Sequence, residues 1–133
     1  MKMKNYVAIF NDGNLTLKDF KLECRDEGWL PICASRSLHD NSISIPVFSS
    51  EETAHKFLCR NFDTKKYVCG LIKLSDDDIL EMSNRGVSIE RLSFAKKIRG
   101  HKDFELDVFV FEVDEKPELD SYGKIFDERT RAF

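Results

Sequence analysis

The sequence has no long hydrophobic run near its start, no close cysteine pair and no Gly/Ser-rich stretch. Its first apolar run, Tyr6–Phe10, spans five residues, which is too short for the core of a secretory signal or for a membrane span. Cys24, Cys33, Cys59 and Cys69 form no C-x-x-C pair. We therefore expect reduced thiols in a cytoplasmic protein that does not bind membranes.

Signatures of common enzymes are also missing, because the chain has no G-x-S-x-G, H-E-x-x-H, P-loop or dinucleotide-binding sequence. No catalytic residue is assigned and no cofactor is expected, so the chain is interpreted as non-catalytic. A small enzyme stays open as an alternative, since His55 and Cys59 stand four residues apart and share one face of a predicted helix. The same pair is only half of a zinc site, and no metal site is predicted.

Length and composition favour a single globular domain. The chain has 133 residues, of which 41% are hydrophobic and 34% are charged, as in a well-solvated folded protein. Its 11 phenylalanines are expected mainly in the core, since aromatic side chains bury large areas. Without a repeat or linker, we predict one domain over residues 1–116, followed by a charged tail over 117–133.

Hydrophobic periodicity predicts an α+β fold. Strands are expected where β-favouring residues cluster or alternate with polar ones, over residues 6–10, 29–34, 43–48, 67–74, 87–92 and 104–113. Helices are expected over 50–62, with a capping box formed by Ser49 and Glu52, and from Ser75 to Gly86. Residues from about Thr16 to Glu27 fit a helix or a bulged strand. The result is a mixed sheet of about five strands carrying two or three helices.

Proline and apolar patterns predict which strands lie at the edges of this sheet. Pro31 interrupts the strand at 29–34, and the strand at 43–48 contains Pro46, so both are predicted to be edge strands. Either edge could pair with a second copy and form a homodimer. The strand at 104–113 is apolar on both faces, which predicts a central position.

Charge is nearly balanced overall but segregated along the chain. The net charge is −3, from 21 basic and 24 acidic residues, which does not favour non-specific nucleic-acid binding. One basic cluster surrounds Gly100 and consists of Lys96, Lys97, Arg99, His101 and Lys102. Flanking Phe94 and Phe104 are expected to anchor this basic loop in the core. An acidic run extends from Glu112 to Asp120.

These features predict a protein that docks on another protein through an acidic surface, such as an immunity protein, an antitoxin or an inhibitor. The predicted protein-binding residues are Asp114, Glu115, Glu118 and Asp120, with Tyr122 and Phe126 as aromatic anchors. The alternative is a nucleic-acid-associated regulator that binds through the basic loop at 96–102.

Overall fold

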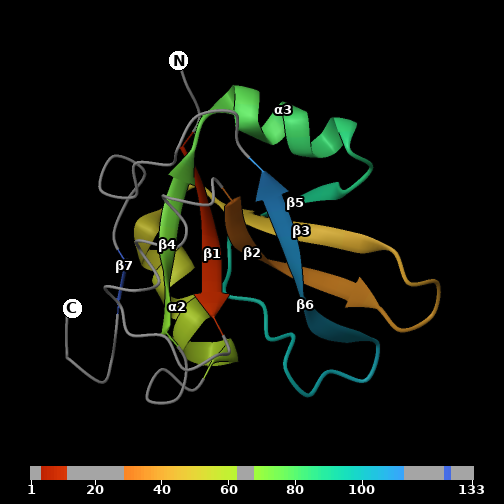
Figure 1. Cartoon of the computed structure of the whole chain (residues 1–133). Helices are drawn as coiled ribbons and strands as arrows, with labels where there is room; N and C mark the ends of the chain where they lie inside the picture. The colour runs from red at the N-terminus through yellow and green to blue at the C-terminus, as the bar shows by residue number, and fades with distance from the viewer. Residues whose placement is uncertain (1–3, 12–28, 63–67, 113–124, 127–133) are drawn as a thin grey trace.

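A computed structural model describes residues 4–11, 29–62, 68–112 and 125–126. In these ranges seven strands form one mixed sheet, and two helices pack on it (Figure 1). The strands are β1 (Asn5–Asn11), β2 (Trp29–Ser37), β3 (Ile43–Phe48), β4 (Val68–Leu74), β5 (Ser88–Leu92), β6 (Phe104–Glu112) and β7 (Ile125–Phe126). The helices are α2 (Glu51–Asn61) and α3 (Asp76–Asn84). This confirms the α+β class; the predicted helix near 16–27 and the boundary at 116–117 lie outside the described residues.

The sheet is organised around β2. The strand order is β5-β3-β2-β1-β4-β7, and β6 pairs with β2 outside this path. Figure 1 shows β2 starting beside β1 and then bending to run along β3. All nine residues of β2 stand opposite β6, from the pair Trp29–Glu112 to the pair Ser37–Phe104. After α2, β4 and α3, the chain returns as β5, which is parallel to β3.

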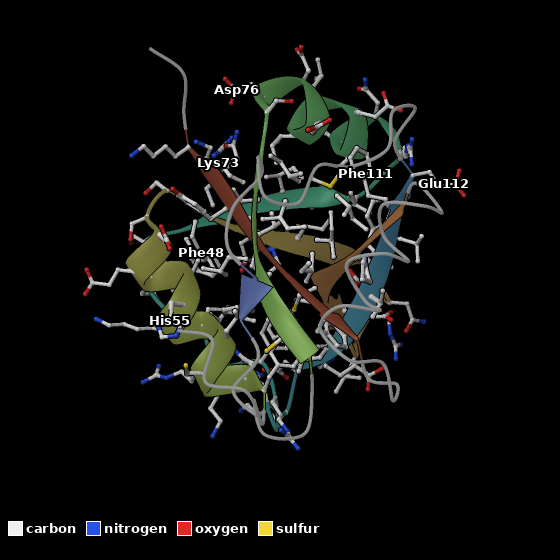
Figure 2. All side chains as sticks on the ribbon, turned by 60° about the vertical axis from the view of Figure 1, so that its left-hand side comes forward. Phe48, His55, Lys73, Asp76, Phe111 and Glu112 are labelled. Atoms are coloured by element: carbon white, nitrogen blue, oxygen red, sulfur yellow. The ribbon has the colours of Figure 1, made fainter. Side chains whose placement is uncertain are left out.

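Alternating strand residues build two cores, one for each helix. In β1, Val7 and Ile9 join the first core, whereas Ala8 and Phe10 join the second. The first core is completed by Ile79 and Met82 of α3, and the second by Ala54, Phe57 and Leu58 of α2. In Figure 2, Phe48 lies beside α2 and Phe111 lies near the end of α3. Each fully buried aliphatic or aromatic side chain contributes about 1.5–3 kcal/mol.

Local signals set the ends of the two helices. Helix α2 begins one residue later than predicted, because the Ser50 hydroxyl, and not Ser49, accepts the Thr53 N–H at 3.0 Å. In α3, Ser75 and Asp78 cap each other reciprocally, as in a capping box. Gly86 follows the last turn of α3 with φ of +91°, a conformation that glycine adopts without steric cost. The predicted end of this helix is therefore confirmed.

The two predicted edge strands are interior strands. Strand β2 pairs with β1, β3 and β6, and β3 pairs with β1, β2 and β5. Pro31 stands opposite Val110 in the β2–β6 pair. In an antiparallel ladder only alternate residues exchange hydrogen bonds with a given neighbour. A proline can therefore lie in an interior strand at a position where that neighbour requires no N–H. Strand β2 also extends beyond the predicted range of 29–34 and ends at Ser37.

The prediction of a central β6 is wrong as well, since within the described ranges β6 pairs with β2 only. The apolar residues of β6 lie in different surroundings. Phe109 and Phe111 pack with the first core, and Leu106 packs against the second. Val108 and Val110 are 37% and 50% exposed. The apolar pattern of β6 therefore reflects a partly uncovered face, and not neighbours on both sides.

Two serine substitutions should have opposite effects on stability. Ser35 is 2% exposed, and its Oγ is the one buried side-chain polar atom among the described residues that has no hydrogen-bond partner. Ser35→Ala should leave the free energy of unfolding unchanged or raise it by about 1 kcal/mol, because it removes an uncompensated hydroxyl. Ser50→Ala should lower it by about 1 kcal/mol, since it removes the α2 N-cap. Urea denaturation measures both changes, and equal losses would contradict the assignment of Ser35.

Candidate functional site

The buried amide of Asn61 fixes the loop between β5 and β6 against the end of α2. Asn61 is fully buried. Its Nδ2 donates to the carbonyl oxygens of Phe57 and Lys96, each at 2.9 Å. Its Oδ1 accepts the N–H groups of Ile98 at 2.6 Å and Arg99 at 3.1 Å. Both donors and both acceptor positions of the amide are thus used, so the loop has a defined position relative to α2.

Further contacts fix the loop on both sides of this amide. Ile98 is fully buried in the second core. Arg60 of α2 donates from Nη1 to the Ala95 carbonyl at 3.0 Å. The turn that follows contains Gly100 at φ of +77° and closes with a bond of 2.9 Å from the His101 N–H to the Ile98 carbonyl. The basic loop is therefore an ordered segment of the fold.

The structure divides the predicted basic cluster. Lys96 turns inward, with its Nζ 3.1 Å from a Glu90 carboxylate oxygen and 4.4 Å from the centre of the Phe104 ring. Lys97, Arg99 and Lys102 are exposed, and no ion pair joins them to another described residue. Within the described part of the chain, Lys97, Arg99 and Lys102 are therefore exposed to a ligand without an ion pair, whereas Lys96 is not.

The flanking aromatic residues also differ from each other. Phe104 packs against the second core and against the His101 ring, at 5.2 Å between ring centres. Phe94, which was expected to anchor the loop, is 58% exposed. The prediction for Phe94 is wrong because Ile98, a smaller apolar residue in the middle of the basic cluster, occupies the buried position instead.

A groove of about 270 Å³ separates the end of α2 from β6. It is lined by Phe10, Asn61, Phe62, Arg99, Leu106, Asp107 and Val108. The Phe10 and Phe62 rings lie 4.7 Å apart between centres and give the groove an apolar wall. Arg99 and Asp107 contribute charges of opposite sign. An apolar hollow with a few polar groups is the usual form of a binding site.

One wall of this groove is the edge of β6 that pairs with no other described strand. The Val108 N–H donates to the side chain of Asp107 at 2.8 Å, a local bond that takes the place of a strand partner. Val110 stands opposite Pro31 of β2, and a proline has no N–H to exchange with it. Val108 lies two residues before Val110 and so has the same orientation in the ladder. Since hydrogen-bonded pairs alternate along an antiparallel ladder, both positions indicate that the N–H and C=O groups of Val108 and Val110 face away from β2.

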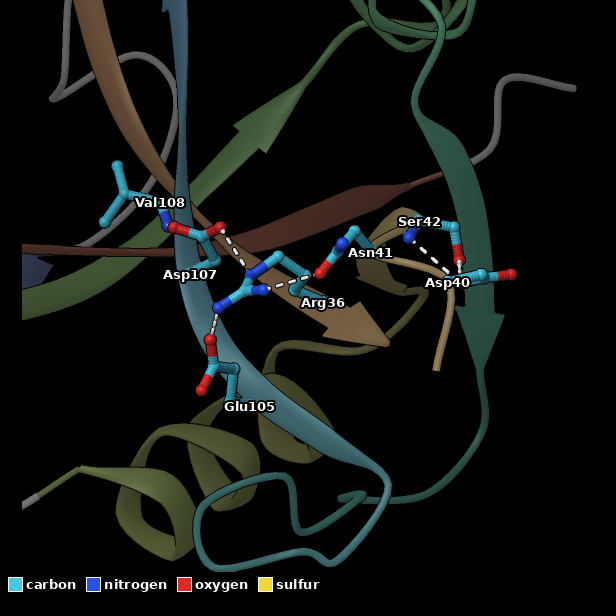
Figure 3. Close-up of polar contacts among 7 residues, drawn as sticks. All are labelled: Arg36, Asp40, Asn41, Ser42, Glu105, Asp107 and Val108. Atoms are coloured by element: carbon cyan, nitrogen blue, oxygen red, sulfur yellow. Dashed lines mark hydrogen bonds and ion pairs between the residues drawn. The ribbon is translucent and has the colours of Figure 1, made fainter. Parts of the chain in front are cut away.

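Arg36 holds the carboxylates on the other face of β6 (Figure 3). Its guanidinium forms ion pairs with Glu105, which stands opposite it in β6, and with Asp107, at 3.4 Å from Nε. It also donates to the Asn41 side chain at 2.9 Å. Because the guanidinium is partly exposed, these pairs orient the acidic groups more than they stabilise the fold.

The predicted acidic site lies largely beyond the described residues. Asp114, Glu115, Glu118, Asp120 and Tyr122 all fall in the range 113–124. The backbone of Phe126 lies in β7, opposite Cys69 of β4. The acidic run does follow β6 directly in the sequence, after Glu112. No pattern in the sequence pointed to Arg36 or Asn61, because their roles depend on contacts between segments distant along the chain.

The predicted pair of His55 and Cys59 is brought together on α2. The Cys59 Sγ lies 3.7 Å from the His55 Nε2. The exposed Cys59 borders a second, shallow groove of about 580 Å³, beside Phe94 and Arg60. No group of three His, Cys, Asp or Glu side chains in the described ranges could hold a metal ion, so the pair stays half a site. Figure 2 shows His55 on the opposite side of the molecule from Glu112.

The other two described cysteines belong to the core. Cys33 and Cys69 are buried in the second core. Burial raises the pKa of the Cys33 thiol well above its ordinary value, and the nearby Cys69 raises it further. A thiol in such surroundings is not activated as a nucleophile. Among these cysteines, only Cys59 is placed to react with a reagent in solution.

The chain matches no protein-family model, no curated protein and no solved structure. Neither described helix is long and apolar enough to cross a membrane. A function of this chain is therefore inferred from its groove, its basic loop and the β6 edge.

Replacing Asn61 should release the basic loop. In Asn61→Ala the buried N–H groups of Ile98 and Arg99 lose their acceptor, at a cost of about 1–3 kcal/mol for each group. The free energy of unfolding should fall, and trypsin should cleave faster after Lys97 and Arg99 under native conditions. Asn84→Ala, at the exposed end of α3, serves as the control and should change neither value. Unchanged proteolysis of Asn61→Ala would show that the amide does not fix the loop.

Proposed function

We propose that this chain is a non-catalytic binding protein that docks on another protein by pairing a strand of its partner with the open edge of β6. One observation carries the proposal: β6 is a strand of nine residues that pairs on one side only among the described residues. An edge strand presents unpaired N–H and C=O groups at a regular spacing. Addition of a partner strand to such an edge is a common mode of protein recognition.

The groove supports this proposal because it lies beside the same edge. Alternate side chains of an added strand fall on the face that carries Leu106, Val108 and Val110. Val108 and Val110 offer exposed apolar surface there, and the groove bordered by Leu106 can take a side chain from the partner. Main-chain bonds then supply affinity, while the groove selects apolar residues at alternate positions of the partner strand.

Charge supports a partner with a basic surface near this strand. Glu105 and Asp107 lie on the other face of β6, and the sequence after Glu112 continues with the acidic run. Acidic groups arranged in this way steer a basic partner during its approach. We keep Asp114, Glu115, Glu118 and Asp120 as proposed contacts, with Tyr122 and Phe126 as anchors. Covering a partner's surface in this way is how an inhibitor, an antitoxin or an immunity protein acts.

Charged substitutions on β6 test this mode of docking. Wild-type protein should capture one stoichiometric protein partner from host lysate, whereas Val108→Lys/Val110→Lys should capture none, because the added ammonium groups cannot be buried without a counter-charge. Leu80→Lys, at a 59% exposed position of α3, is the matched control and should behave as wild type. A partner retained equally by all three proteins would dock elsewhere and contradict the proposal.

A second candidate function is nucleic-acid binding by the basic loop. The observation in its favour is that Lys97, Arg99 and Lys102 are exposed on a loop whose position Asn61 and Ile98 fix. Ordered, exposed cations bind phosphates without first having to organise the loop. Nucleic-acid binding of this kind depends strongly on salt, because each phosphate contact releases counterions.

Neutralising the loop tests this second function. If the loop binds phosphates, a single-stranded 20-mer should bind at low salt, and Lys97→Gln/Arg99→Gln/Lys102→Gln should reduce the slope of log affinity against log salt by about 2. The control is Lys4→Gln/Lys56→Gln/Lys73→Gln, which removes three cations from other parts of the surface. No binding by wild type at low salt, or an equal loss in both variants, would eliminate this function.

A further inference from the structure

We propose that the β6 edge pairs with β6 of a second copy of this chain, as an antiparallel strand pair whose two-fold axis passes through Val108. This inference rests on the proposed use of the β6 edge and names its partner strand. It also moves the predicted homodimer from the strands at 29–34 and 43–48, which are interior, to the strand that is open in the described part of the fold.

The sequence of β6 is complementary to itself in one register. The strand runs from Phe104 to Glu112, so full overlap of two copies places Val108 opposite Val108 of the partner subunit. In this register Leu106 faces Val110 of the partner subunit, which forms a continuous apolar stripe on the exposed face. On the other face Asp107 stands opposite Phe109 of the partner subunit, and no two acidic residues stand directly opposite each other.

Registers shifted toward the start of β6 lack this complementarity. A pair centred on Asp107 places the two Asp107 carboxylates directly opposite each other. A pair centred on Leu106 places Glu105 opposite Asp107 of the partner subunit, and does so twice. Like charges directly across a strand pair are destabilising. The register with the greatest overlap is therefore also a register without charge repulsion, and shifts toward the start of the strand are disfavoured.

The backbone at the centre of the strand fits the same register. The Val108 N–H faces away from β2 and, among the described residues, donates to the adjacent Asp107 side chain at 2.8 Å. In the symmetric pair this N–H bonds instead to the Val108 carbonyl of the partner subunit, and the reverse bond forms across the axis. Val110 of the partner subunit then lies beside Leu106, at the groove lined by Phe10 and Phe62, and extends the second core across the interface.

Disulfide trapping tests both the pairing and its register. In a Cys24→Ser/Cys59→Ser background, Val108→Cys should form a disulfide-linked dimer under mild oxidation, because hydrogen-bonded antiparallel pairs hold their Cα atoms about 5.5 Å apart. Val110→Cys is the matched control: two copies of residue 110 lie about 13 Å apart in this register and should not be linked. Linkage of Val110→Cys in preference to Val108→Cys would overturn the register.

Analytical ultracentrifugation tests the dimer without a covalent bond. Wild type and Leu80→Lys should sediment at twice the chain mass of 15.5 kDa, and Val108→Lys should sediment as a single chain because it places two lysines face to face. Unchanged circular dichroism will show that the variant is folded. A wild-type dimer that persists in Val108→Lys would overturn the inference.

The same variants separate this inference from the proposed function. If wild type is a single chain at about 100 µM, yet captures a different protein that Val108→Lys/Val110→Lys does not, the second copy is not the partner and the docking edge stands. If wild type is a single chain and captures no partner that depends on β6, both proposals fail. A dimer that depends on Val108, with Val108→Cys linked, supports this inference and the use of the β6 edge for strand pairing.

Discussion

The pairing of β2 with β6 over nine residue pairs is the interaction on which the rest of this structure depends. Strand β2 also contacts β1 and β3, and its alternate residues contribute to both cores. Its side chains therefore line both faces of the sheet, the one covered by α2 and the one covered by α3. Within the described residues β6 pairs with β2 alone. This single ladder therefore determines where the groove and the exposed apolar stripe lie.

A second constraint, the buried amide of Asn61, sets the opposite wall of the groove. Three of its four hydrogen bonds join the last turn of α2 to a loop that begins more than thirty residues later in the chain, and the fourth stays within α2. A buried polar group of this kind is costly unless it is fully satisfied, so the arrangement tolerates little variation. The amide positions Arg99 beside the groove, while the β2–β6 ladder positions Asp107 on the other side.

The helices and strands could be predicted from local sequence signals, whereas the pairing of the strands could not. The start of α3 follows from Ser75, Asp78 and the acidic first turn, all of which act within a few residues. The predicted edge strands were wrong because Pro31 was interpreted without knowing which residue of the neighbouring strand it faces. That register is set by the tertiary fold. In the candidate site, the basic loop was predicted, but the inward turn of Lys96 depends on Glu90 and Phe104. Contacts of this kind leave no periodic signal in a sequence.

The bond between Asp107 and the Val108 N–H also has a consequence for solubility. Uncovered strand edges promote uncontrolled aggregation, and proteins limit this with charged residues on the edge strand. In the unbound protein the Asp107 carboxylate accepts the Val108 N–H, which is the central donor of this edge. A partner strand must displace that carboxylate, so pairing exchanges one hydrogen bond for another instead of adding a new one. Such an exchange favours reversible association with well-matched strands and disfavours indiscriminate stacking into fibres.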